Sequence, residues 1–193
     1  NQIAFDEQSR VNTFVHVNNT EKDIRNGVLM CLNGTGILNS WLRSATGSLP
    51  YEEMNALAAK APAGAAGLRI YPFGNGAERI LANQDSGAAI QNLQFNLHGR
   101  EHLLRAAQEG IVFALAYGVD IMKEMQMDIR RVRAGHANMF LSPLFRQVFA
   151  NTLNVVIELY NTDGAQGAAR AAGIGAGLFS QADAFKGMEC IAT

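Results

Sequence analysis

The chain has 193 residues, 48% hydrophobic and 17% charged, with 16 basic and 17 acidic side chains and a formal net charge of −1. This length and composition are typical of one globular domain and exclude a disordered chain. The balanced charge provides no field of one sign, so we expect neither nucleic acid nor an anionic membrane as a partner.

The first third of the sequence predicts two strands followed by two helices. Residues 11–18, VNTFVHVN, alternate like a half-buried strand, and residues 27–32, GVLMCL, predict a second, more buried one. The turn NGTG at 33–36 then opens a helix with apolar residues at helical spacing, namely Ile37, Leu38, Trp41 and Leu42. Residues 50–62, PYEEMNALAAKAP, predict a short helix between two prolines.

A long central helix is expected in the middle of the chain. Residues 67–97 predict strand and loop, punctuated by glycines. From Arg100 to Met125, apolar and small residues recur at steps of three and four, which indicates one amphipathic helix. Gly110 and Gly118 inside it each cost about 1 kcal/mol relative to Ala, so we expect both to pack closely against a neighbour.

The last third alternates strand and helix. Residues 129–135 and 155–160 predict strands, SPLFRQVFANTL at 142–153 predicts a helix, and residues 164–177 predict a helix of small residues with Asp163 as its N-cap. This alternation favours a layered α/β fold. Because no linker or repeat divides the sequence, we expect one domain over residues 1–193.

Two junctions between a strand and a helix are the candidate ligand sites. In RAGHANMFLSP, residues 133–143, helix amides would favour an anion or polar ligand, and Gly135 would permit close approach of the backbone. In NGTG, the glycines and the Thr35 hydroxyl suit a wall lined by phosphate. Spacing alone also allows plain connections at both places. If both bind ligand, we expect them to face one cleft.

Other patterns favour structural roles. GIGAG at 173–177 ends a helix instead of following a strand, which is the wrong context for a dinucleotide site. His98 and His102 have the spacing of helical metal ligands, but nothing completes a set, so we expect capping and packing and no metal site. His136 has no Ser or Cys nucleophile as a partner, which argues against a hydrolase triad.

The remaining charged and thiol groups are also expected to be structural. We expect a loop ion pair at Glu78 and Arg79 and a carboxylate on the helix face at Glu109. Cys31 and Cys190 are expected to be free thiols in a reducing cytoplasm. No apolar run approaches the roughly 20 residues that span a bilayer, and no signal pattern opens the chain, so we expect a soluble cytoplasmic protein.

Several segments together resemble the C-terminal half of the FGGY carbohydrate kinases, the xylulokinase branch in particular. They are VNTFVHV, GVLMCLNGTGILNSWLR, YEEMNALAAKAPAGAAGLRIYPFGNGAER, HGREHLLRAAQEGIVFALAYGVDIMKEM, VRAGHANMFLSPLFRQVFANTL and DGAQGAARAAGIGAG. The resemblance implies an α/β, actin-like (ribonuclease H-like) ATPase domain with a mixed sheet flanked by helices. It also implies that the chain is the C-terminal, nucleotide-binding domain of a two-domain kinase without its N-terminal domain, an expectation that its start at Asn1 suits.

The resemblance assigns an ATP site, with Mg²⁺, to the two junctions. The loop AGHANMFLSP would hold adenosine through Gly135, Ala137 and Asn138, and Phe140 matches the glycerol kinase branch as well. The turn would hold phosphates through Gly34, Thr35, Gly36 and Asn39, with the alignment at Asn39 and Ser40 uncertain by one residue. The acceptor would be a sugar, D-xylulose by this branch.

Three departures from the family pattern matter. Ala134, Gly135 and His136 stand where members often carry three glycines, and ILANQDSGAAIQ at 80–91 replaces an acidic segment with proline and Arg-Gly. The Asp-Gly-Thr phosphate loop and the Asp general base belong to the family's first domain, so we assign no catalytic residue here and expect the chain alone to be inactive. A non-catalytic nucleotide- or sugar-sensing module with the same fold is the alternative, and a hydride-transfer enzyme would rest only on GIGAG. Whether the protein forms a homodimer stays open.

Overall fold

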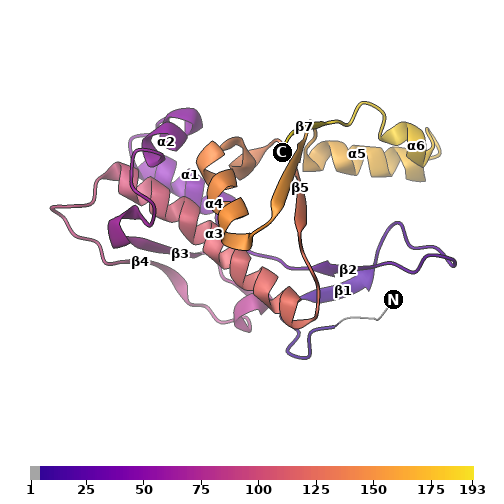
Figure 1. The fold of residues 1–193 in the computed structure, drawn as a ribbon, viewed down its shortest axis with the longest axis horizontal. Coiled ribbons are helices and arrows are strands. Elements are labelled where there is room, and N and C mark those ends of the chain that lie inside the picture. The colour runs from indigo at the N-terminus through magenta and orange to yellow at the C-terminus, as the bar shows by residue number, and fades with distance from the viewer. Residues whose placement is uncertain (1–4) are drawn as a thin grey trace. The chain divides into compact units, whose positions relative to one another are not determined.

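The computed structural model describes residues 5–193, which form helices and short strands in two compact units. The first unit runs to Asp128 and the second from Ile129 to Thr193 (Figure 1). The predicted α/β class is therefore observed, with the strands paired in three small sheets. The two units are described separately below.

The first unit begins with an antiparallel hairpin of β1, Asn12–Val15, and β2, Asn26–Leu29. Both strands are shorter than predicted, and β2 is only partly buried instead of being an inner strand. Val11, just before β1, is buried in a cluster with residues from two other elements, Ala77, Ile80 and Ile121. That cluster attaches the hairpin to the long helix.

Helices α1, Thr35–Ala45, and α2, Tyr51–Ala58, follow as predicted. Leu38 and Leu42 are the buried residues of α1, whereas Ile37 and Trp41 are 56% and 55% exposed. The four apolar side chains therefore do not form one buried face. Leu38 and Leu42 form one row along the helix and are buried, whereas Ile37 and Trp41 form a second row and are exposed.

Helix α3, Arg100–Glu124, is the central element of the first unit, as predicted. It contacts α1, α2 and β3, Arg69–Phe73 (Figure 1). A Cβ at Gly110 would overlap the Ile70 carbonyl oxygen, and one at Gly118 would overlap the Met30 side chain. Both glycines are thus sites of close packing, which confirms the reason expected for their presence in a helix.

The segment between α2 and α3 is a hairpin with short helical turns around it. Strand β3 pairs antiparallel with β4, Gly87–Gln91, from Arg69 opposite Gln91 to Phe73 opposite Gly87. The 3-10 turns η1, Ala65–Gly67, and η2, Glu78–Leu81, flank β3. Strand and loop were predicted here, so this expectation is confirmed.

The second unit is a parallel βαβ arrangement with an added strand. Strand β5, Arg131–Gly135, leads through η3, Asn138–Leu141, into α4, Pro143–Leu153, and back to β6, Val156–Tyr160, which pairs parallel with β5. Helices α5, Gly164–Gly175, and α6, Gln181–Ala184, precede β7, Cys190–Ala192, which pairs antiparallel with β6. The sheet of β5, β6 and β7 is therefore mixed, and the predicted elements of this half are all observed.

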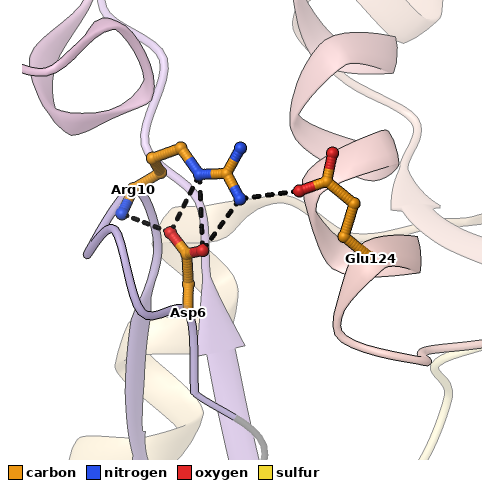
Figure 2. A network of polar contacts seen from close by, with 3 residues as sticks. All are labelled: Asp6, Arg10 and Glu124. Carbon is orange, nitrogen blue, oxygen red and sulfur yellow. Dashed lines mark hydrogen bonds and ion pairs between the residues drawn. The ribbon is translucent and has the colours of Figure 1, made fainter.

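An ionic cluster joins the segment before β1 to the end of α3 (Figure 2). The Asp6 carboxylate accepts hydrogen bonds from the Arg10 backbone N–H, at 2.6 Å, and from the Arg10 guanidinium, at 2.8 Å for Nη2. Nη2 also donates to Glu124 Oε2 at 2.7 Å. The Asp6 side chain is only 5% exposed. Hydrogen bonds from Arg10 hold the pKa of Asp6 below its ordinary value.

Replacing Arg10 is expected to lower stability in a pH-dependent way. Because the folded-state pKa of Asp6 is lowered, its bonds stabilise the fold above the unfolded pKa of Asp, about 4, and this contribution is lost as the pH falls through the folded value. Arg10→Ala should reduce the free energy of unfolding at pH 7 by about 2 kcal/mol, a value typical of hydrogen bonds to charged groups. Denaturant unfolding of both proteins at pH 7 and pH 3 measures this.

The control is Glu124→Gln, because the Glu124 side chain is 63% exposed and should change stability by less than about 1 kcal/mol. An Arg10→Ala penalty that is equally large at pH 3 and pH 7 would show that lost packing, and not the bonds to Asp6, is responsible.

Candidate functional site

The turn from Asn33 to Gly36 joins β2 to α1 and has a left-handed residue at its centre. Gly34 has φ +86° and is the N-cap of α1, which has no side-chain cap. The first helical hydrogen bond runs from Leu38 N to Gly34 O at 2.7 Å. The amides of the first turn of α1 therefore point out of the helix end, where an anion can accept their hydrogen bonds.

Packing within the protein requires glycine at Gly34 but not at Gly36. A Cβ at Gly34 would lie 3.1 Å from the Pro72 carbonyl oxygen and 3.5 Å from Asn75 Cβ, in a backbone conformation that side chains disfavour. A Cβ at Gly36 would meet nothing within 4 Å. The open space over Gly36 leaves room for a ligand to approach the backbone.

Thr35 and Asn39 lie four residues apart, so they share one face of α1. Both are half-buried, and Gly36 and Ser40 on the neighbouring face are exposed. The structure thus groups Gly34, Thr35, Gly36 and Asn39 around the first turn of one helix, as the sequence led us to expect.

The loop after β5 contains the second set of predicted residues. Gly135 ends β5, and a Cβ there would overlap the Thr162 carbonyl oxygen and lie 3.3 Å from Asp163 Cα. His136 N donates to Tyr160 O at 2.8 Å, which extends the pairing of β5 with β6. The backbone at Gly135 is therefore held against the segment that enters α5, and its glycine cannot be replaced without a shift of backbone.

Asn138 has the backbone geometry of a specialised loop position. Its φ is +52°, it begins η3, and its side chain is exposed. Asn is one of the few residues that tolerate this left-handed conformation. Phe140, by contrast, packs edge-to-face with Phe145 and Phe149 at centroid distances of 5.5 and 5.6 Å. Phe140 anchors the loop, and Asn138 is left at its surface.

The structure adds one neighbour and corrects one detail of this junction. Asp163 is the N-cap of α5, with its Oδ1 accepting from Gln166 N at 2.8 Å, and it lies beside Gly135. The N-cap role was predicted, but the proximity needed the fold. The start of α4 offers fewer amides to a ligand than expected, because Pro143 has no N–H and the Ser142 hydroxyl accepts from Phe145 N at 3.2 Å.

Strand β5 also carries exposed arginines that one carboxylate partly neutralises. Glu158 on β6 pairs with Arg131 at 2.8 Å and Arg133 at 3.1 Å. Its hydrogen bond from Arg133 holds the pKa of Glu158 below the ordinary value. Two cations therefore share one anion on this face of the sheet.

The histidines of α3 have the structural roles expected of them. His102 Nδ1 accepts from the N-cap amide, Gly99 N, at 3.1 Å and so caps the start of α3. His98, just before the helix, instead accepts from Gln94 N at 2.9 Å and closes the preceding loop. No group of three potential metal ligands occurs within residues 5–193. GIGAG lies at the end of α5 and not after a strand, also as expected.

The expected ion pair of Glu78 with Arg79 is not observed. Arg79 donates to the Asn12 side chain, and Glu78 accepts a hydrogen bond from the Cys31 thiol, which raises the pKa of Cys31. A protonated thiol is a poor nucleophile. Cys31 and Cys190 are both free, as predicted.

Glu109 was expected on the helix face and is instead 5% exposed. Its Oε1 accepts from Arg105 Nε at 2.7 Å and from Gly64 N at 3.0 Å. The ion pair could have been predicted, because Glu109 follows Arg105 by four residues in a helix. Its burial could not, because it depends on a loop distant in sequence that folds over both side chains.

Comparison with known proteins assigns the chain to a family. Residues 11–176 match the model of the C-terminal domain of carbohydrate kinases of the FGGY family. The chain belongs to the FGGY family of carbohydrate kinases. Among curated relatives, it is 36% identical over 109 residues to the xylulose kinase of Haemophilus influenzae, covering 55% of this chain and 21% of that protein. It is 30% identical over 143 residues to the L-xylulose/3-keto-L-gulonate kinase of Escherichia coli, covering 72% of this chain and 27% of that protein.

Solved structures share the fold along nearly the whole chain. The gluconate kinase of Lactobacillus acidophilus superposes with a TM-score of 0.76 at 21% identity, over 99% of this chain and 38% of that one. The glycerol kinase of Plasmodium falciparum, solved with ADP, gives 0.75 at 22% identity, over 96% and 37%. The predicted actin-like α/β fold is confirmed, and the chain spans about a fifth to two fifths of the length of these four relatives.

Proposed function

We propose that this chain is the ATP-binding domain of a sugar kinase that transfers the γ-phosphoryl group of ATP to D-xylulose, giving D-xylulose 5-phosphate. The observation that carries the proposal is the family match over residues 11–176, which includes both candidate junctions. Similarity to the xylulose kinase of H. influenzae supports xylulose as the acceptor.

In this proposal the turn at the start of α1 holds the phosphates. Gly34 and Gly36 expose backbone amides, and the Thr35 hydroxyl and the Asn39 amide can donate to phosphate oxygens. Mg²⁺ bound to ATP would neutralise charge on the β- and γ-phosphates. We assign no residue of this chain to the metal.

The loop after β5 holds adenosine in the same proposal, through Gly135, Ala137 and Asn138. Gly135 lets the loop pack against Thr162 and Asp163, and the exposed Asn138 amide can bond to the base or the ribose. This chain positions ATP, while the resemblance assigns the general base to the other domain of the kinase. Such catalysis consists mostly of positioning and charge neutralisation.

The test is the substrate preference of the full-length protein. Purified enzyme is assayed for ADP formation with MgATP and, in turn, D-xylulose, L-xylulose, gluconate and glycerol. We expect the largest kcat/KM with D-xylulose. A larger value with another acceptor would contradict the assignment of the sugar, and no turnover with any acceptor would favour a sensing module.

None of the helices within residues 5–193 has both the length and the apolar character needed to cross a membrane. We propose a cytoplasmic enzyme whose direct partners are ATP, the sugar and the other domain of the kinase.

A further inference from the structure

A hollow of about 650 Å³ lies in the first unit between β3 and α3. Glu109, Phe113 and Tyr117 follow one another at steps of four along α3, so they share one face of the helix, and all three line the hollow. The other α3 residues that line it are small, namely Ala106, Gly110 and Ala114. The hollow therefore lies beside the contact of Gly110 with β3, where small residues adjoin a row of large side chains.

One oxygen of the buried Glu109 carboxylate is available to a ligand. Both of its hydrogen bonds converge on Oε1, from Arg105 Nε and from Gly64 N. No fully buried side-chain oxygen in the described part of the chain lacks a partner, so Oε2 is not sealed in the core. Glu109 lines the hollow, and neither of these hydrogen bonds uses its Oε2.

The surroundings define what this acceptor can bind. Phe113 and Tyr117, 54% and 45% exposed, give the hollow aromatic walls suited to an apolar body. Glu109 is already paired with Arg105, and Arg69 adds a second cation at the rim. A cationic ligand would face Arg69 and a carboxylate already neutralised by Arg105, and an anionic one would face the carboxylate. A neutral hydrogen-bond donor is not repelled by either charge.

We infer that this hollow is a binding site for a small, neutral, largely apolar molecule that carries one N–H or O–H donor. The donor bonds to Glu109 Oε2, and the apolar body packs on Phe113 and Tyr117. The volume lies in the range of roughly 300 to 1,000 Å³ that is usual for small-molecule sites. None of the residues proposed to hold ATP lines the hollow, so this site is independent of the proposed function.

The test compares indole with benzofuran, which has nearly the same shape but no N–H. Each compound is titrated into the ¹⁵N-labelled chain. We expect indole to shift the amide signals of Gly67, Gly110 and Phe113 saturably, with a Kd on the order of 1 mM, as fits a fragment of this size. Benzofuran should bind about fivefold more weakly or worse, because it leaves Oε2 without a donor.

Two variants with exposed aromatic side chains locate the site. Phe113→Ala removes a wall without disturbing the core and should weaken indole binding about fivefold or more. Phe95→Ala, which removes a 92% exposed ring outside the hollow, should leave it unchanged. Equal affinity for indole and benzofuran, no shifts at these amides, or equal effects of the two variants would each overturn the inference.

Discussion

The 193-residue chain on its own is expected to show no turnover with MgATP and D-xylulose. It matches only the C-terminal domain of its family and covers 21% of the xylulose kinase of H. influenzae. We found no candidate general base with a partnering phosphate loop in its sequence. In the proposed function the base and most of the sugar pocket belong to the other domain, so ATP bound to this chain alone would have no productive encounter with the acceptor hydroxyl.

A coupled assay for ADP formation measures this, with the full-length protein under the same conditions as the positive control. Sugar kinases of ordinary efficiency turn over at about 1 to 100 per second. Turnover in that range by the chain alone would contradict the assignment of catalysis to the other domain.

The substitution of glycine by alanine is expected to have opposite effects on stability at two helical positions. At Gly110 the new Cβ would overlap the Ile70 backbone carbonyl, which cannot move without displacing β3, so Gly110→Ala should destabilise the first unit by about 3 kcal/mol. At Gly167 in α5 nothing lies within 4 Å of the new Cβ, and Gly167→Ala should stabilise by up to about 1 kcal/mol through helix propensity.

Denaturant unfolding followed by circular dichroism compares the two variants with the parent chain. Since the chemical change is identical, the comparison isolates packing from propensity. If Gly110→Ala proved as stable as the parent, the close approach of β3 to α3 would be wrong.

The sequence predicted best the elements whose signal is local. Helix α3 was foreseen to within one residue because its apolar and small residues repeat over seven turns, and Gly110 and Gly118 already implied a close neighbour. The cap at Asp163 follows from short-range chemistry. The candidate turn and loop were found for the same reason, since each adjoins a strand and a helix.

What could not be predicted depends on contacts between distant segments. Helical spacing permits either Trp41 or Leu42 to face the core. The fold buries Leu42, because its side of α1 packs against the rest of the first unit. Burial of Glu109 requires Gly64 to fold back over it, 45 residues away in sequence. The left-handed backbone of Asn138 and the contact of Gly135 with Asp163 likewise depend on the tertiary structure. The division into two compact units could not be predicted, because no linker-like segment marks the boundary in the sequence.

Steady-state kinetics of Asn138→Ala in the full-length kinase tests the central claim, nucleotide binding by this domain, most directly. The exposed Asn138 amide is proposed to bond to adenosine, so its loss should raise KM for ATP about two- to tenfold, the equivalent of about 0.5 to 1.5 kcal/mol, with KM for the sugar unchanged. Thr35→Val, measured alongside, should instead lower kcat if the hydroxyl acts on the transferring phosphate. If both variants remain folded and neither changes KM for ATP or kcat, the assignment of these two junctions to ATP is wrong.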